Sequence, residues 1–341
     1  MKVGVDARAL LAGRGVARFT RGLLVALADG YGDDEWLAFV PGRTPVEPVH
    51  PRVTLVRHRL GGRALFGAAA VARRPTLAGL LGGVDVVWLP APAPVAPGAP
   101  YVLTVHDRSW ERRPRDFSSY ERAWHVVARP RALARGAAAV TTDSHAVAAE
   151  LRAAWGVQAA VVSPGVDGAP SPAAAPGRDP AAARPDRYLL FVGARDPRKA
   201  LDVATAAHAR ARARGLDAGL VVVGDGLRRV DDAELAALYA SALAVVAPSH
   251  LEGFGLPPLE AAAHGTPAVV TDLPCFAETL GDAALRVPVG DVGALANALV
   301  RIGGDDALRA RLGAAARERA ALYTWERAAA ALHPLLARAA A

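Results

Sequence analysis

Short apolar runs alternate along the chain with longer segments of helical periodicity. Such alternation predicts an α/β fold in which helices cover parallel sheets. In the first half we expect strands at 2–5, 36–40, 53–57, 84–89, 101–106, 138–142 and 161–164. In the second half we expect strands at 188–192, 220–223, 244–247, 268–270 and 285–287.

The pattern breaks between the two halves, where proline, alanine and glycine predominate. Such composition is typical of an exposed linker between domains, and the length of 341 residues suits about two domains. Ligands of open parallel sheets bind beyond the carboxyl ends of the strands, so two facing domains would form a cleft that holds the active site. We expect a first domain at 1–164, a linker at 165–185, a second domain at 186–318 and a C-terminal helix at 319–341.

The composition excludes several classes of protein. The single cysteine, Cys275, excludes an internal disulfide framework and a cysteine metal cluster. No apolar stretch has the length of a membrane span, and the first residues predict a strand instead of a signal peptide, so we expect a cytoplasmic protein. The formal charge of +7 favours polyanionic partners such as nucleotide sugars or anionic lipid surfaces. Nucleic acid is disfavoured because no recognised binding motif is present.

Residues 249–267 carry the clearest sign of chemistry. A Gly-Phe-Gly loop leads from a strand into a helix whose first turn contains prolines, where they are tolerated. Backbone N–H groups at such a helix start are unpaired and partly positive, so they can bind a phosphate or diphosphate. Glu252 and Glu260 flank the turn, and Glu260, about two helical turns deeper, can accept hydrogen bonds from a sugar or ribose. The alternative interpretation is a surface glutamate and a helix-capping one.

This segment resembles the E-x7-E signature of the retaining glycosyltransferases of family 4, and the resemblance extends over nearly the whole chain. It implies the GT-B architecture, with two facing doubly wound Rossmann-like domains. It also implies that Glu252 approaches the hydroxyls of the transferred sugar and that Glu260 holds the nucleotide ribose. The turn between them would face the sugar and the diphosphate, through Gly253 and the amides of Phe254, Gly255 and Leu256.

A basic loop follows the first predicted strand of the second domain. Cations there would face the negative charge that builds on the bridging oxygen of a departing diphosphate, and preorganised cations lower that barrier. The loop resembles the family pattern Gly-x-x-Glu-Pro-Arg-Lys-Asn-Leu, which makes Lys199 the principal diphosphate contact. Arg195 or Arg198 would replace a family arginine that this chain lacks at its usual position. A solvated charge run is the alternative.

Further candidates lie at other strand ends. His106 and Asp107 end a strand, and the resemblance places the histidine against the donor sugar, where it orients hydroxyls and assists deprotonation of the acceptor. Asp107 can equally be a helix cap. By resemblance, Gly15 keeps the backbone near the donor phosphate or the acceptor, and Gly224 occupies the turn after the second strand of the second domain.

The second domain departs from the family pattern after Gly226. Family members run through a helix and a further strand before the helix that here begins near Asp231, and four residues cannot hold a parallel crossover. We therefore expect one β-α unit to be missing and the second sheet to be one strand short. The missing unit normally supports the base pocket. At the C-terminus, Tyr323-Thr-Trp-Glu326 resembles a family helix that crosses back to the first domain, although a free-standing helix is the alternative.

Between Arg108 and Arg135, eight arginines stand against three acidic residues. This basic face predicts either attraction to an anionic membrane surface, at the inner face of the membrane, or a solvated helical face. The tryptophans Trp110, Trp124 and Trp155 suit either core positions or contacts to an acceptor.

Together these features predict a metal-independent retaining glycosyltransferase of polysaccharide biosynthesis. It would move a sugar from a nucleotide diphosphate sugar to a hydroxyl of a glycan, lipid or cell-envelope acceptor. No Asp-x-Asp metal motif is present, and we expect no cofactor, because Lys199 and the helix amides replace the charge of a divalent ion. The alternatives are a nucleotide-sugar epimerase of the same architecture and a catalytically weak protein that binds a sugar nucleotide.

Overall fold

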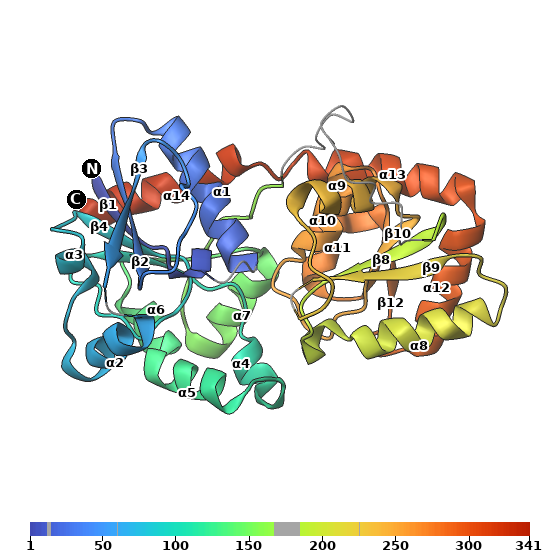
Figure 1. The fold of residues 1–341 in the computed structure, drawn as a ribbon, viewed down its shortest axis with the longest axis horizontal. Helices are drawn as coiled ribbons and strands as arrows, with labels where there is room; N and C mark the ends of the chain where they lie inside the picture. The colour runs from blue at the N-terminus through green and yellow to red at the C-terminus, as the bar shows by residue number, and fades with distance from the viewer. Residues whose placement is uncertain (12–14, 60, 167–184, 225) are drawn as a thin grey trace. The chain divides into compact units, whose positions relative to one another are not determined.

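The computed structural model describes residues 1–11, 15–59, 61–166, 185–224 and 226–341 (Figure 1). The chain forms two compact units. Unit 1 comprises Met1–Gly165 together with Thr324–Ala341, and unit 2 comprises Val166–Tyr323. The linker predicted at 165–185 lies mostly outside the described residues. In the described ranges, every helix is too short or too polar to span a bilayer.

Unit 1 is built on a parallel sheet, which in its described residues has seven strands in the order β3-β2-β1-β4-β5-β6-β7. β1 pairs with β2 on one side and with β4 on the other, so the strand order changes direction there. This is a doubly wound order with one strand added at the end. The strands are β1 (Lys2–Asp6), β2 (Glu35–Pro41), β3 (Val53–His58), β4 (Val86–Leu89), β5 (Tyr101–Thr104), β6 (Ala139–Thr142) and β7 (Ala160–Val161).

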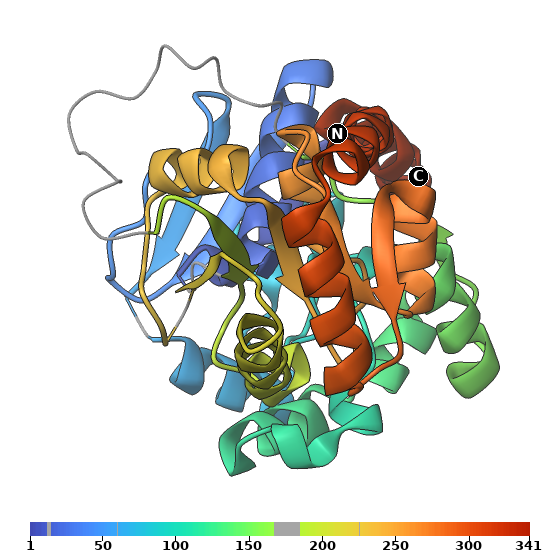
Figure 2. The ribbon, with the colours of Figure 1, turned by 90° about the vertical axis from the view of Figure 1, so that its right-hand side faces the viewer.

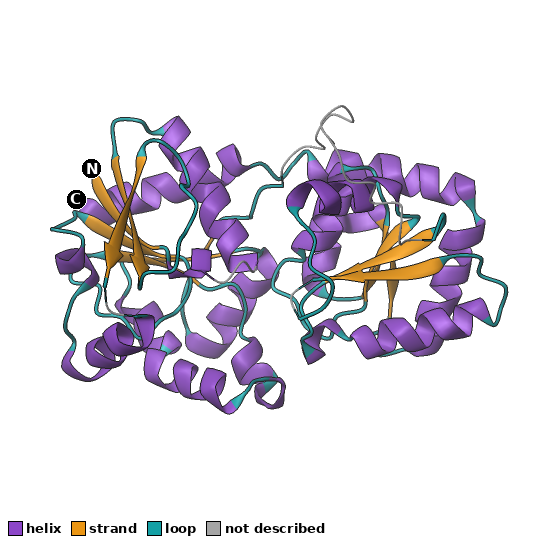
Figure 3. Cartoon of the chain, in the orientation of Figure 1, coloured by secondary structure: helices purple, strands orange, loops and turns teal. Residues whose placement is uncertain are grey.

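Helices cover both faces of this sheet (Figure 3). α1 and α14 pack on one face, and α2, α3 and α7 pack on the other. The helices are α1 (Gly15–Gly30), α2 (Gly62–Ala72), α3 (Leu77–Leu80), α4 (Ser109–Arg112), α5 (Ser119–Ala128), α6 (Pro130–Gly136), α7 (His145–Trp155) and α14 (Trp325–Ala340), with 3-10 helices η1 (Arg8–Leu11) and η2 (Pro114–Asp116).

The arginine-rich stretch is not one helix but the series α4, η2, α5 and α6. Pro114 and Pro130 each open a new piece, since proline is tolerated at the start of a helix but not in its interior. Arg129, between α5 and α6, has a φ of 48°, a left-handed conformation that ends α5.

The C-terminal helix α14 is part of the core of unit 1. Trp325 and Leu332 are buried in the core that α14 forms with α1 and β4. A Cβ on Gly22 of α1 would lie 2.4 Å from the Trp325 ring, so only glycine permits this close packing. The helix begins later than the predicted 319, because α13 continues to Ala320 and Thr324 caps α14 by accepting a hydrogen bond from the Arg327 N–H at 3.2 Å.

Unit 2 contains a second parallel sheet, whose described residues form five strands in the order β12-β11-β10-β8-β9. In chain order this is 2-1-3-4-5, the other common doubly wound arrangement. The predicted fold class and the shortened second sheet are therefore confirmed. The strands are β8 (Tyr188–Val192), β9 (Gly219–Val223), β10 (Ala244–Ala247), β11 (Ala268–Thr271) and β12 (Ala284–Val287).

Helices also cover both faces of the second sheet (Figure 2). α8 and α12 pack on one face, and α9 and α10 pack on the other. A short connection leads from β9 to α9, closed by the Gly224 N–H, which donates to the Arg228 carbonyl at 2.8 Å. The helices are α8 (Leu201–Arg212), α9 (Asp232–Ser241), α10 (Leu256–Ala263), α11 (Pro274–Leu280), α12 (Val292–Gly304) and α13 (Asp306–Ala320), with η5 (Pro197–Lys199) and η6 (Gly281–Ala283).

Candidate functional site

The strongest candidate site lies in unit 2, beyond the carboxyl ends of β8 and β10. These strands are neighbours in the sheet, and the strand order changes direction between them. Ligands of doubly wound sheets bind at such a switch point, because the loops of adjacent strands there lead to helices on opposite faces. The loop after β8 contributes Lys199, and the loop after β10 contributes Glu252.

Lys199 and Glu252 form a direct ion pair, although 53 residues separate them. Lys199 Nζ donates to Glu252 Oε1 at 2.6 Å, and Ser249 Oγ donates to the same oxygen at 2.7 Å. The side chains of Lys199 and Glu252 are 22% and 13% exposed. The pair is therefore shielded from water but still reachable, and an incoming anion can replace Glu252 as the partner of the lysine.

Ser249 is a site residue that the sequence analysis missed. Its side chain is buried, and its carbonyl accepts a hydrogen bond from Thr271 Oγ1 at 2.6 Å, which ties the loop to β11. A second tie joins the two site loops, because the His250 N–H donates to the Arg198 carbonyl at 2.8 Å. The position of Glu252 is thus fixed from both sides.

The two arginines of the basic loop differ in their surroundings. Asp196 accepts hydrogen bonds from Arg198 Nε at 3.0 Å and Nη2 at 2.6 Å. Burial would raise the pKa of Asp196, but the hydrogen bonds and charge of Arg198 outweigh it, and the pKa is lowered. Arg195 is exposed, and its Cβ lies beside Gly226. The guanidinium of Arg198 is therefore engaged within the loop, which leaves Arg195 as the better placed arginine for a ligand.

Gly224 and Gly193 bring the turns after β9 and β8 into contact. Gly224 has a φ of 142°, and a Cβ there would lie 1.8 Å from the Gly193 carbonyl oxygen. Glycine is required on both counts. A Cβ on Gly193 would lie 3.5 Å from Lys199 Cγ. The backbone at Gly193 therefore lies beside the aliphatic part of the Lys199 side chain.

The start of α10 presents unpaired backbone N–H groups. Gly255 has a φ of 92°, and a Cβ there would lie 2.4 Å from the Phe276 ring. Proline occupies two positions of the first helical turn, as the sequence predicts. Within the described ranges, no acceptor is found for the N–H groups of Phe254, Gly255 and Leu256. Three amides near a helix N-terminus form a site suited to an anion.

Glu260 lies closer to this helix start than the sequence analysis expected. α10 begins at Leu256, so Glu260 lies about one helical turn into it and not two. Glu260 Oε2 accepts a hydrogen bond from the hydroxyl of Tyr239 at 2.7 Å. Tyr239 is buried on α9 and was not among the expected site residues, because nothing in the sequence shows that α9 and α10 are adjacent.

A second cluster lies at the carboxyl edge of the sheet in unit 1. His106 Nδ1 lies 2.8 Å from Asp143 Oδ2, and the two residues follow the adjacent strands β5 and β6. Burial by itself would lower the pKa of His106, but the charge and hydrogen bond of Asp143 outweigh it, and the pKa of His106 is raised. No well-aligned hydrogen-bond partner of His106 Nε2 is found among the described residues. This nitrogen is itself buried, and the backbone of Pro90 also raises the pKa of the ring.

Two other predicted residues of unit 1 have simpler surroundings. Asp107 Oδ1 accepts a hydrogen bond from the Ser109 N–H at 2.7 Å and so supports the start of α4, as the capping alternative predicts. Gly15 opens α1, and a Cβ there would meet nothing within 4 Å. Gly13, from the same glycine loop, lies outside the described residues.

In the described parts of the chain, no group of three metal-binding side chains is present. Cys275 is buried on α11, and burial together with the charge of Glu252 raises the pKa of its thiol. It therefore lies near the site as a neutral, unreactive side chain.

Comparison with known proteins agrees with this geometry. Residues 13–169 match the family described as Glycosyltransferase Family 4, and residues 186–305 match the one described as Glycosyl transferases group 1. A phosphatidyl-myo-inositol mannosyltransferase of Mycolicibacterium smegmatis is 39% identical over 165 residues, which are 42% of this chain and 42% of that protein. The match thus spans less than half of the relative's length.

Two solved structures share the fold. Sucrose-phosphate synthase from Thermosynechococcus elongatus has a TM-score of 0.76 at 22% identity, over 99% of this chain and 98% of that chain. The Anabaena protein HepE, solved with UDP and glucose, has a TM-score of 0.68 at 16% identity, over 98% of this chain and 99% of that chain. With family matches in both units and the two parallel sheets of the GT-B architecture, the chain belongs to family 4 of the glycosyltransferases.

Proposed function

We propose that this protein is a retaining glycosyltransferase that moves a sugar from a nucleoside diphosphate sugar to a hydroxyl of a glycan or lipid acceptor without a metal ion. The observation that carries the proposal is the pairing of Lys199 with Glu252 at the strand-order reversal of unit 2. The matched mannosyltransferase, whose name specifies phosphatidyl-myo-inositol, supports an acceptor of the lipid class.

In this proposal the diphosphate binds between Lys199 and the three unpaired amides at the start of α10. The ammonium group leaves Glu252 and pairs with the diphosphate, while the carboxylate, still held by Ser249, turns to the hydroxyls of the sugar. Glu260, which the hydroxyl of Tyr239 holds in place, binds the ribose. Each charged group of the site thereby gains a ligand partner, so no charge is left buried and unpaired.

The bond between the anomeric carbon and the diphosphate oxygen breaks, and that oxygen takes the electron pair. Lys199 and the amides stabilise the charge that develops on it, which is the role a divalent ion has in other enzymes. The acceptor oxygen bonds to the same face of the anomeric carbon, and its proton passes to the departing diphosphate. We assign no covalent step to Glu252, because in this proposal its carboxylate is held by Ser249 and binds the hydroxyls of the sugar.

We assign His106 to the hydroxyls of the donor sugar or the acceptor. Asp143 holds its Nδ1, so the ring is fixed in orientation. The raised pKa of His106 favours the protonated ring, which donates a hydrogen bond to a sugar oxygen.

Incubation of the purified protein with labelled nucleoside diphosphate sugars, with and without polyol-lipid and glycan acceptors, tests the proposal. We expect release of nucleotide that depends on the acceptor, retention of the anomeric configuration by NMR, and full activity in the presence of a chelator. An isomerised donor would instead identify an epimerase. Binding without turnover of any donor would contradict catalysis.

The chain offers a second test that needs no acceptor. Its 40 basic residues include only two lysines, Lys2 and Lys199, so amine acylation followed by mass spectrometry reports on the site with an internal control. Uridine, guanosine, adenosine and thymidine diphosphates are compared as protecting ligands. We expect one of them to protect Lys199 and to leave Lys2 unchanged. Equal labelling of Lys199 with every nucleotide would contradict the proposed diphosphate site.

A further inference from the structure

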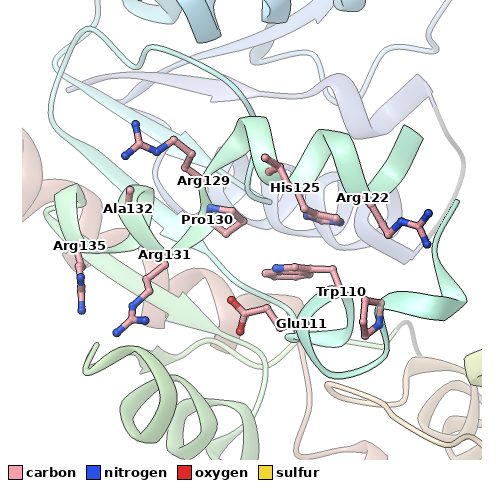
Figure 4. Close-up of a pocket in the computed structure, with 11 residues that line it drawn as sticks. Trp110, Glu111, Arg122, His125, Arg129, Pro130, Arg131, Ala132 and Arg135 are labelled. Atoms are coloured by element: carbon pink, nitrogen blue, oxygen red, sulfur yellow. The ribbon is translucent and has the colours of Figure 1, made fainter. Parts of the chain in front are cut away.

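The basic segment of unit 1 contains a pocket that the proposed transfer reaction does not use. It has a volume of about 690 Å³ and lies among α4, α5 and α6 (Figure 4). In its wall the rings of Trp110 and His125 lie face to face, with centroids 4.5 Å apart and planes 10° apart. The wall thus offers both an aromatic surface and the side chains of four arginines, which are Arg122, Arg129, Arg131 and Arg135.

The charge of this pocket is not balanced from within. Glu111 is the one acidic residue in its described lining, and it accepts hydrogen bonds from Arg108 Nε at 2.8 Å and from Trp155 Nε1 at 3.1 Å. Among the residues that the structure describes, no acidic side chain lies within ion-pair distance of Arg129 or Arg131, and both are exposed. Exposed arginines that lack acidic partners are suited to bind phosphate groups.

The outer face of α5, beside the pocket, is apolar. Val126 lines the pocket and is 75% exposed, and Tyr120 and Val127 on the same helix are 54% and 47% exposed. A small soluble phosphate ester would leave these side chains in water. An anionic lipid surface matches both features, because its phosphates pair with the arginines while its interface takes up the apolar side chains.

We propose that this face of unit 1, formed by α5, α6 and the pocket, docks on an anionic membrane surface, with the phosphate headgroup of a phospholipid in the pocket. The sign of the charge and the exposed apolar side chains both point to that partner. The inference does not depend on the transfer reaction, because it concerns residues outside the unit 2 site.

Sedimentation of the full chain with vesicles tests it. One set of vesicles is phosphatidylcholine, and the other contains phosphatidylglycerol in addition. We expect binding to the second set that weakens as salt is added. Arg129→Gln and Arg131→Gln should each weaken binding about fivefold, which corresponds to about 1 kcal/mol per basic residue at an anionic leaflet. Val126→Asp should weaken it as well.

Arg311→Gln is the matched control, since it removes the same charge from an exposed position on α13 in unit 2. Circular dichroism melts of all variants check the fold. Equal binding to both sets of vesicles, or equal weakening by the control, would overturn the proposal. Binding of soluble glycerol phosphate to the pocket without any binding to vesicles would also overturn it, because the site would then bind a free phosphate ester.

Discussion

Both units contain the same kind of strand-order reversal, but their sheets differ in the strands that lie beyond it. In unit 1 the strand beyond the reversal, β2, is paired with the further strand β3, and six of its seven residues are buried. In unit 2 the corresponding strand, β9, is the last strand of the sheet among the described residues, and only two of its five residues are buried. The switch point of unit 2 therefore has one described flanking strand on that side, whereas that of unit 1 has two.

The two units also differ in the residues at the carboxyl ends of their strands. Both hold an acid beside a base on loops of adjacent strands, His106 with Asp143 in unit 1 and Lys199 with Glu252 in unit 2. Burial lowers the pKa of His106, but the charge and hydrogen bond of Asp143 outweigh it, and the pKa is raised. We therefore expect His106 in unit 1 to contribute to the pH dependence of the reaction.

The largest effect is expected from Lys199→Ala. Loss of the charge that faces the leaving group should lower kcat/KM by about a hundredfold or more, or about 3 kcal/mol, with the fold intact. Lys2→Ala is the control, because Lys2 lies in unit 1 and pairs with Glu35 at 3.4 Å. Steady-state kinetics measure both. An unchanged rate in the first variant would remove Lys199 from the mechanism.

Two glycine substitutions compare the loops that follow strands in the two units. Gly224→Ala places a Cβ 1.8 Å from the Gly193 oxygen at a φ of 142°, and we expect a loss of about 3 kcal/mol in the free energy of unfolding. Gly15→Ala meets nothing within 4 Å at the start of α1, so we expect a change within about 1 kcal/mol. Urea unfolding measures both. Similar losses in the two variants would show that the close approach of Gly224 to Gly193 does not determine the cost of the substitution.

Asp143→Asn tests the expected pH dependence. Without the carboxylate, the strongest influences that raise the pKa of His106 are lost while burial still lowers it, so the pKa should fall, and activity near neutral pH should drop about tenfold if the pKa moves by about one unit. The raised pKa of the wild-type histidine contributes stability that is fully present below its unfolded-state pKa and is lost as the pH rises through the folded-state value.

Thermal unfolding and pH–rate profiles between about pH 5 and 9 follow both effects, and the variant should lose this part of the pH dependence of stability. Rescue of the rate in the variant by a lower pH would support the assignment. A profile identical to that of the wild type would show that another group titrates.

The smallest effect is expected from Ser249→Ala. It removes one of the two hydrogen bonds to Glu252 Oε1 and should cost about 1 kcal/mol, or about fivefold in kcat/KM, with little change in stability. Ser249→Thr keeps the hydroxyl and serves as the conservative comparison. Equal rates for all three proteins would show that Lys199 alone positions the glutamate.

The strands were largely predictable from the sequence because they are continuous apolar runs. β8 and β10 have the predicted bounds, and both are almost fully buried. The expected strand at 101–106 ends earlier, at Thr104, because His106 turns away to meet Asp143. α2, with its run of alanine, glycine and leucine, was not expected.

The sequence predicted which residues belong to the candidate site but not which of them contact one another. Motif resemblance supplied Lys199 and Glu252, but their contact depends on β8 and β10 being adjacent, which no local pattern reveals. Asp143 and Ser249 were not predicted as site residues, since His106 and Thr271, which contact them, come from other strands. The scarcity of lysine was the overlooked signal: in a chain whose basic residues are almost all arginine, Lys199 stands out.

The return of α14 to unit 1 makes unit 2 an insertion within a single folded body. A Cβ on Gly165 would lie 2.2 Å from the Trp325 backbone nitrogen, so the two points at which the chain leaves and re-enters unit 1 are adjacent. Joining Gly165 directly to Thr324 should therefore give unit 1 as a single short chain, and residues 166–323 should be obtainable as a separate continuous fragment.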